Sequence, residues 1–347
     1  MNSILKLRIK TAAWMLAGLF FTNGAFAQEE SAGLTFSGSV DTYFRYNLNS
    51  TNDATDGGTL APGTSFANLP GFSLGMINLV AAYDGEKSGF VADIVLGPRG
   101  ADAVFASPQA GAFYASSNIV NQLYAYWNVS DAVTLTVGNF NTFLGYEVIS
   151  PVANYNYSTS YMFSYGPFSH TGLKADITAG DVSLMVGVFN PTDLTEFNPD
   201  NTYYGGAQIG YGGAYLNFLF GDGYFQTDLT AGWDLTETIY VGVNGTFNKD
   251  LFSGGALYLQ NSFSDAFSIG LRGEYFNDVD DVVLGIDPNA DESVIDLTLS
   301  ANYTVGNLTI IPEVRLDTFS EDAILPESGG APQSSLTSFL IAAVFAF

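Results

Sequence analysis

The chain has 347 residues, of which 47% are hydrophobic and 13% are charged, and it contains no cysteine. Aromatic residues reach 15%, which excludes an intrinsically disordered chain. The formal net charge of -25 argues against a nucleic-acid partner, because clustered Lys and Arg bind the phosphate backbone. Without cysteine, disulfides and thiolate metal sites are also excluded.

The N-terminal segment is predicted to be a cleaved export signal. Basic residues among the first ten precede a short apolar stretch at 12–21, and Ala25-Phe26-Ala27 forms an A-x-A cleavage site. We therefore expect residues 1–27 to be a Sec signal peptide and residues 28–347 to form a single mature domain. An uncleaved anchor is the alternative, but the apolar stretch is too short to span a bilayer.

Residues 28–347 are predicted to form β-strands throughout. In the first strand, at 34–47, apolar residues such as Leu34 and Phe36 alternate with polar residues such as Thr35. Successive side chains of a strand point to opposite faces, so one face is apolar and the other is polar. The same two-residue period returns along the chain, and no 3.6-residue period competes with it over the length of a helix.

The connections between the predicted strands alternate between short and long. Short turns rich in Gly, Asp, Asn and Ser are predicted at 84–88, 130–132, 179–181, 212–213, 235–238, 264–266 and 306–307. Polar and mostly longer connections lie between them, and the longest is 141–169. This pattern predicts an all-β fold, a transmembrane antiparallel up-and-down β-barrel of about 16 strands (range roughly 14–18), with short periplasmic turns and long extracellular loops.

Aromatic residues are placed as a lipid-facing band requires. The apolar-face residue before several short turns is aromatic, as at Trp127 and Trp233, and Phe72 and Phe220 take the same face near the opposite strand ends. Two such rows are typical of the two membrane interfaces of a barrel. The chain ends on Phe347, with apolar residues at every second position before it. This ending resembles the assembly signal that outer-membrane barrels present to their insertion machinery.

The middle of the chain carries a run of three short motifs. G-x-F-x-x-x-x-G-x-E covers 138–147, N-Y-x-Y-S covers 154–158, and P-F-x-H-T-G covers 167–172. The run resembles a family of outer-membrane β-barrel porins of Gram-negative bacteria. This resemblance implies a pore-forming barrel and does not imply a particular solute.

The polar strand faces are predicted to line a water-filled lumen. Charged residues fall on this face at Asp41, Arg45, Asp93, Lys174, Asp176, Asp228, Arg272, Glu274, Asp296, Glu313, Arg315 and Asp317. Acids outnumber bases two to one among them, which predicts a mild preference for cations. The alternative is that these charges pair with each other and hold the shape of the barrel.

The long segment 141–169 is the candidate for a loop that constricts the pore. Tyrosine rings stack on sugar-like solutes, and carboxylates and amides form hydrogen bonds with them. The candidate contact residues in and next to the segment are Tyr146, Glu147, Asn154, Tyr155, Tyr157 and His170. The alternative is that the segment packs across the extracellular mouth or forms an oligomer contact.

These features together predict a porin of the cell outer membrane for passive diffusion of small hydrophilic solutes, without enzyme activity, cofactor or metal. The expected partners are outer-membrane lipids and lipopolysaccharide, small polar solutes, the barrel-assembly machinery through Phe347, and further copies of the chain in a homotrimer. The carboxylates of the acidic loop at 278–292 are of the type that binds Ca²⁺ or Mg²⁺, and that role stays open. The loop lacks the spacing of an EF-hand, so we interpret it as a solvated loop.

Two other functions stay open from the sequence. A barrel without a channel would act as an adhesin or a structural protein, and the long acidic loops fit that interpretation. An outer-membrane hydrolase is the second. His170 is the only histidine, so a Ser-His mechanism would have to use it, and no G-x-S-x-G motif is present.

Overall fold

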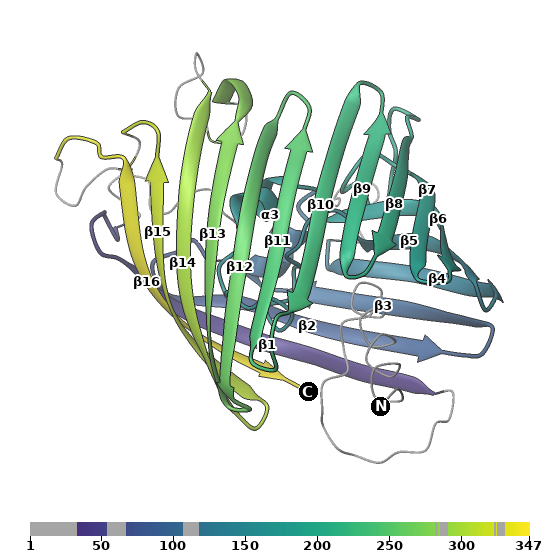
Figure 1. Cartoon of the computed structure of the whole chain (residues 1–347), viewed down its shortest axis with the longest axis horizontal. Coiled ribbons are helices and arrows are strands. Elements are labelled where there is room, and N and C mark those ends of the chain that lie inside the picture. The colour runs from purple at the N-terminus through teal and green to yellow at the C-terminus, as the bar shows by residue number, and fades with distance from the viewer. Residues whose placement is uncertain are drawn as a thin grey trace.

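The chain folds into a closed antiparallel β-barrel (Figure 1). The computed structural model describes residues 33–53, 67–106, 118–281, 284, 291–322, 324 and 330–347. Within these residues sixteen strands pair in sequence order, and the first strand pairs with the last to close the ring. The predicted all-β up-and-down barrel is confirmed, including its strand number. The predicted signal peptide, residues 1–27, lies outside the described residues.

The strands are β1 Leu34–Asn47, β2 Gly71–Asp84, β3 Ser88–Leu96, β4 Val120–Ser130, β5 Val133–Asn141, β6 Ser169–Ala179, β7 Val182–Phe189, β8 Tyr204–Tyr211, β9 Ala214–Gly221, β10 Tyr224–Asp234, β11 Ile239–Asn248, β12 Phe252–Ser264, β13 Phe267–Asp278, β14 Glu292–Val305, β15 Leu308–Phe319 and β16 Ser335–Ala346. Each predicted short turn joins an even-numbered strand to the next odd-numbered one, from β2 and β3 to β14 and β15. We call this end of the barrel the short-turn end and the other the long-loop end.

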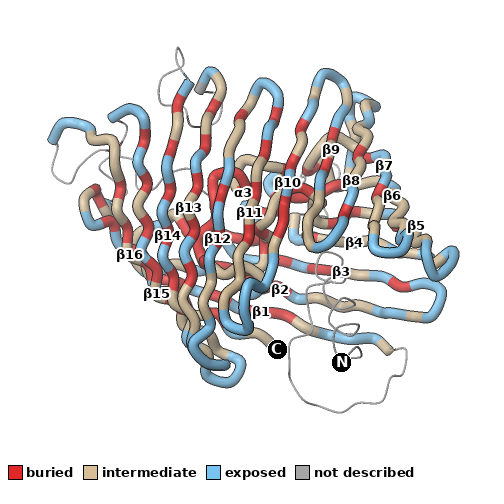
Figure 2. The backbone as a smooth tube through the Cα atoms, viewed as in Figure 1, coloured by how far each residue is buried: buried red, intermediate tan, exposed pale blue. Residues whose placement is uncertain are grey.

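The two faces of the sheet differ as the alternation predicts. In β14, Ile295, Leu297 and Leu299 are about half exposed, whereas Asp296 and Thr298 between them are fully buried. Figure 2 shows the same change between exposed and buried residues along many strands. The aromatic residues before the short turns also point outward, at Tyr83, Trp127, Tyr211, Trp233, Phe263 and Tyr303. Apolar groups outside and polar groups inside are the arrangement that a lipid-embedded barrel needs.

The barrel closes through backbone hydrogen bonds between its two ends. Along the β1–β16 pair, Val40 lies opposite Phe345 and Arg45 lies opposite Leu340. Beyond the last strand residue, Gly38 and Phe347 exchange two backbone hydrogen bonds of 3.0 Å. Every strand therefore has a partner on both sides, and no strand edge is left for lipid to cover.

In the described ranges three helical elements supplement the barrel: α2 (Pro98–Ala103), α3 (Tyr161–Tyr165) and the 3-10 turn η2 (Val279–Asp281). No helix in the described part of the chain is long and apolar enough to cross a membrane. Figure 1 shows α3 behind β11 and β12, within the outline of the barrel. Ser160 caps α3, because its side chain accepts a hydrogen bond from the Phe163 amide.

Candidate functional site: the inner segment and the charged wall

The connection from β5 to β6, residues 142–168, lies against the inner face of the barrel. We call it the inner segment. It forms hydrogen bonds to side chains of β1, β10, β11, β13, β14 and β15. In the ring of sixteen strands, β13 and β14 lie opposite β5 and β6, the two strands that the segment connects. The segment therefore crosses the interior of the barrel and is anchored on the far wall.

The anchor on that wall is a group of six charged residues from three consecutive strands. We call it the charged wall, and its members are Arg272 and Glu274 of β13, Asp296 of β14, and Glu313, Arg315 and Asp317 of β15. Arg272 Nη2 lies 2.8 Å from Asp296 Oδ2, and Arg315 Nη2 lies 2.9 Å from Asp317 Oδ1. All six residues are at most 3% exposed. The register across β13, β14 and β15 brings Arg272, Asp296, Arg315 and Asp317 into contact.

The carboxylates of the charged wall bind backbone amides of the inner segment. Glu274 accepts hydrogen bonds of 2.8 Å from the amides of Tyr161 and Met162. Glu313 accepts them from the amides of Tyr157 and Ser158, at 2.8 and 3.2 Å. Buried backbone donors need such partners when they are not part of a helix or a sheet ladder. The wall thus supplies the partners that allow an irregular segment to lie inside the barrel.

The arginines of the wall bind the carbonyl groups of the same segment. Arg272 Nη1 donates to Ser158 O at 2.7 Å, and Arg315 Nη1 donates to Thr159 O at 2.7 Å. Arg272 Nη1 also lies 2.7 Å from Glu147, whose other oxygen accepts from the Ser160 amide at 2.6 Å. Glu147 is 6% exposed, so the structure places this candidate within the anchor.

The candidate tyrosines of the segment differ in how far they reach solvent. Tyr157 is fully buried, and its hydroxyl donates to Asp41 at 2.5 Å. Tyr146 is partly exposed and stacks on Tyr258 with 4.1 Å between ring centroids. Tyr155 is partly exposed as well. Tyr146 and Tyr155 can therefore stack on a solute in this arrangement. Tyr157 instead anchors the segment to β1.

Close packing of Tyr146 depends on a glycine of β11. A Cβ atom at Gly242 would lie 2.3 Å from the Tyr146 hydroxyl, which is closer than real Cβ contacts allow. The same hydroxyl donates to Tyr240 Oη at 3.0 Å. Burial raises the pKa of the Tyr146 hydroxyl above its ordinary range, so it stays a neutral donor at physiological pH.

The last two candidates of the segment region, Asn154 and His170, are both engaged in local contacts. The Asn154 side chain accepts from the Val148 amide at 2.9 Å and donates to the Val148 carbonyl at 2.5 Å. His170 is fully buried on β6, with Nε2 2.9 Å from Thr142 Oγ1. Among the described residues no carboxylate contacts His170. This environment does not provide the acidic partner that a Ser-His-Asp mechanism uses.

Three predicted lumen acids outside the charged wall are held by neutral donors. Asp41 accepts from the Met76 amide, Asp93 from side-chain amides of β2 and β4, and Asp228 from the Gly145 amide at 2.9 Å. All three are at most 4% exposed. The bond from Gly145 ties the start of the inner segment to β10.

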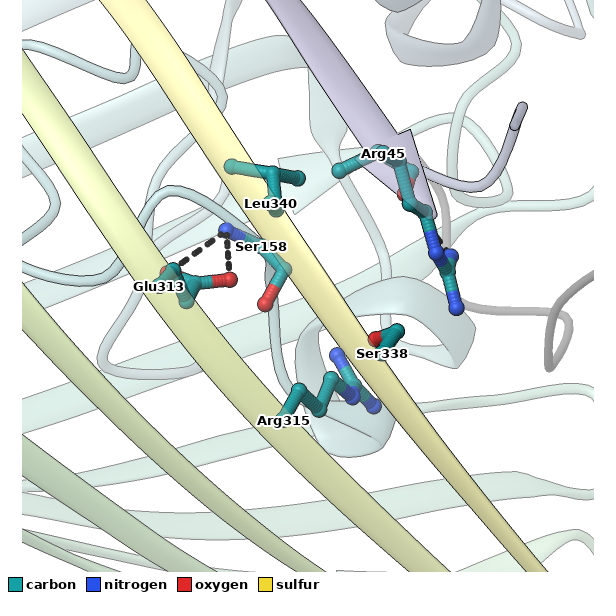
Figure 3. A pocket seen from close by; sticks show the side chains of 7 residues that line it. Arg45, Ser158, Glu313, Arg315, Ser338 and Leu340 are labelled. Carbon is teal, nitrogen blue, oxygen red and sulfur yellow. Dashed lines mark hydrogen bonds between the residues drawn. The ribbon is translucent and has the colours of Figure 1, made fainter. Parts of the chain in front are cut away.

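The predicted lumen bases Arg45 and Lys174 have different surroundings. Arg45 is buried and donates from Nη1 to the Ala67 carbonyl at 2.8 Å, while its Nε and Nη2 have no hydrogen-bond partner. It lines a cavity of about 10 Å³ together with Arg315 and Ser338 (Figure 3). A cavity of that size accommodates one water molecule. Lys174 instead pairs with Asp176 at 2.9 Å, and both side chains keep contact with solvent.

Two further residues that anchor the inner segment, Arg99 and Asp193, belong to no motif in the sequence. Arg99 of α2 is buried, donates from Nε to the Ile149 carbonyl at 3.0 Å, and lies over the Tyr157 ring. Asp193, after β7, accepts from the amides of Phe168 and Ser169 at 2.8 and 2.9 Å. Burial raises the pKa of Asp193 to about 6. In the sequence each is an isolated charge between predicted strands, a pattern that usually indicates a solvated residue.

The acidic loop after β13 satisfies its own backbone in the described part. Asp291 accepts from the Asp280 amide at 3.0 Å, and Asp278 accepts from the Leu284 amide at 2.6 Å. Asp287 lies outside the described residues. Among those that are described, no group of three or more His, Asp or Glu side chains is arranged to hold a metal ion.

The closed barrel of sixteen strands with an apolar outer band defines an outer-membrane β-barrel of porin architecture. Residues 33–347 match the family described as "Putative beta-barrel porin-2, OmpL-like", and the chain belongs to this family. The predicted membership of a porin family is confirmed at this level. A comparison with curated proteins finds no match.

Solved outer-membrane proteins share the fold. The anion-selective porin from Comamonas acidovorans is 14% identical, with a TM-score of 0.55 over 91% of this chain and 99% of that chain. A loop-deletion mutant of OmpT from Vibrio cholerae is 12% identical, with a TM-score of 0.53 over 91% of this chain and 100% of that chain. The trimer form of in-vitro folded OmpT is 11% identical, with a TM-score of 0.53 over 91% and 99%. At these identities the likeness shows the fold alone.

Proposed function

We propose that this outer-membrane porin passes small hydrophilic solutes by passive diffusion, with a mild preference for cations, through a lumen that the inner segment narrows. The observation that carries the proposal is the anchoring of residues 142–168 on the charged wall. A barrel of about 16 strands is wide enough for an aqueous channel, and a segment fixed across it restricts what passes. Residues 1–27, the predicted signal peptide, would direct export and then be removed.

The balance of charge inside the barrel supports the cation preference. The predicted lumen residues comprise eight acids and four bases, and the structure adds four buried acids, Glu147, Asp193, Asp278 and Glu292, and one buried base, Arg99. Low-dielectric walls focus the field of such an excess into the aqueous space, which raises the local concentration of cations. Lys174 and Asp176 keep contact with solvent, so their charges act on passing ions directly.

Conductance of the purified protein in a planar bilayer tests the proposal. Stepwise current increments are expected when single barrels insert. In a potassium chloride gradient, the reversal potential should have the sign of a membrane that is more permeable to potassium. A folded barrel that inserts without any current step would overturn the channel, and a reversal potential of the opposite sign would overturn the cation preference alone.

One observation favours the alternative of a barrel without a channel. The interior holds an apolar cluster of inner-face and segment residues, namely Phe140, Leu144, Met185, Phe189 and Leu219. An apolar plug would suit a structural or adhesive protein, because dry contacts inside the barrel block water. The same bilayer experiment decides between the two functions, provided that a gel shift on heating shows the inserted protein to be folded.

The proposed partners follow from the surface of the barrel. The outward apolar band suits outer-membrane lipids and lipopolysaccharide, and Phe347 at the closing seam is proposed to be read by the barrel-assembly machinery. A homotrimer is proposed because one structural relative, OmpT of Vibrio cholerae, is described in a trimer form. Chemical crosslinking of the detergent-solubilised protein tests the trimer. If only monomers are found after crosslinking, the proposed trimer is contradicted.

A further inference from the structure

A cavity of about 290 Å³ opens inside the barrel at its short-turn end. Residues 151–155 of the inner segment line one side, and inner-face residues of β12, β14, β15 and β16 line the other. Thr304 and Thr309, which flank the turn between β14 and β15, place the cavity at this end. A solute that passes the inner segment would meet this cavity on the periplasmic side.

The lining of this cavity differs in chemistry from the charged wall. Its lining residues, all within the described part of the chain, carry no charged side chain. Amides and hydroxyls come from both walls, at Asn154, Tyr155, Gln260, Asn302, Thr304, Asn307 and Thr309. Apolar side chains such as Ile311 and Val344 complete it. A cavity without charges offers no compensation for the desolvation of an ion, so it selects against charged ligands.

Asn302 and Tyr155 of this lining are held in fixed positions. The Asn302 side chain donates from Nδ2 to the Tyr155 carbonyl at 3.1 Å, which fixes its amide. The Tyr155 hydroxyl has the side chains of Ser268 and Asn302 as hydrogen-bonding neighbours. Its ring packs over Gly270, where a Cβ atom would lie 2.2 Å away, so the ring is held in place. The lining therefore presents a fixed amide beside a fixed aromatic ring.

We propose that this cavity binds an uncharged polyhydroxylated solute of monosaccharide size. The inference rests on the proposed diffusion function for the solute's route to the cavity. Sugar hydroxyls both donate and accept, which matches the amides and hydroxyls on both walls of the cavity. The C–H face of a sugar packs on an aromatic ring, and the volume lies near the lower limit of about 300 Å³ for ligand pockets.

Two measurements with D-glucose as the probe test the site. Saturation-transfer NMR on the detergent-solubilised full-length protein reports binding whether or not the barrel conducts. Glucose signals should gain intensity, and gluconate, which has similar size and a negative charge, should gain at least tenfold less. In planar bilayers, glucose added on the short-turn side should produce brief interruptions of the ion current.

Variants locate the binding. Asn302→Leu should reduce the glucose signal at least tenfold, and Gln260→Leu is the second variant in case the first does not fold. Thr178→Val, on β6 and away from the cavity, is the matched control and should bind as the wild type does. A gel shift on heating verifies that each barrel is folded.

The outcomes separate this inference from the proposed function. Ion current without glucose binding overturns the sugar site and leaves the channel standing. Glucose binding that Asn302→Leu or Gln260→Leu abolishes, in a barrel without current, supports the site and overturns the diffusion function. Glucose binding that both folded variants retain places the sugar elsewhere and overturns the site.

Discussion

Arg272 is the single residue that joins the inner segment and the charged wall most directly. Its guanidinium contacts Glu147 and Asp296 and donates to two carbonyl groups of the segment. Replacing Arg272 with Met leaves both carboxylates buried without this cation. We expect the free energy of unfolding to fall by about 3–5 kcal/mol, the usual cost of breaking a buried ion pair. Guanidinium unfolding of the refolded barrel in detergent measures the change.

Lys249→Met provides the matched control for this substitution. Lys249 pairs with Asp250 at 3.5 Å, and both side chains are largely exposed. Exposed pairs contribute roughly 0–1 kcal/mol, so the control should unfold close to the wild type. Equal losses in the two variants would show that Arg272 does not anchor the segment.

Asp193 gives a prediction about pH. Burial raises the pKa of Asp193 from 3.8 to about 6, so the folded state favours the protonated carboxyl more than the unfolded chain does. This contribution to stability is complete below pH 4 and is lost as the pH rises through 6. Asp193→Asn keeps an oxygen for the amides of Phe168 and Ser169 and does not ionise. The variant should therefore become more stable than the wild type as the pH rises, by up to about 3 kcal/mol at pH 7.

Unfolding curves at pH 3.5 and pH 7 test this difference, because charges common to both proteins cancel. A variant whose advantage is the same at both values would contradict the raised pKa. Asp193→Ala serves as the control, since it removes the acceptor and should destabilise the start of β6 at either pH.

At the scale of elements, inner-face glycines make room for the aromatic rings of the inner segment. Gly242→Ala places a methyl group against Tyr146, and we expect a loss of about 1–3 kcal/mol in the free energy of unfolding from overpacking. Gly245→Ala, on the same strand, is the control because nothing lies within 4 Å of its Cβ position. In a Tyr146→Ala background the cost of Gly242→Ala should largely disappear, and a cost that persists would place the clash elsewhere.

The strands and short turns could be predicted because their signals are local. The alternation in β14 and the Gly306–Asn307 turn are readable within a few residues, and the structure confirms both. The helices α2 and α3 have six and five residues, which is too short for a helical period to appear.

The anchoring of the inner segment was not predictable in the same way. Glu313 binds the amide of Tyr157, 156 residues away in the sequence, and Glu274 binds that of Tyr161, 113 residues away. A backbone amide has no residue-type signature, so nothing in the sequence marks it as the partner of a distant carboxylate. The sequence pattern placed both acids on the inner face, and the fold alone supplied their partners.

At the scale of the whole molecule, an acidic interior predicts a salt-dependent selectivity. The screening length falls from about 10 Å at 0.1 M salt to about 3 Å at 1 M, so the permeability ratio of potassium to chloride should decrease over this range. Asp176→Asn should lower the ratio and Lys174→Met should raise it, since the two side chains are in contact and both reach solvent. Reversal potentials measure the ratio, and a shift in the same direction for both variants would contradict this account.

The seam between β1 and β16 has a consequence for biogenesis. The second neighbour of β1 is β16, which lies at the far end of the sheet in sequence order. Until β16 pairs with β1, both margins of the growing sheet present bare amide and carbonyl groups that hydrocarbon cannot solvate. A chain without β16 leaves β1 unpaired on one side, so a stop codon shortly before Phe339 should yield a product that is degraded instead of one inserted in the bilayer.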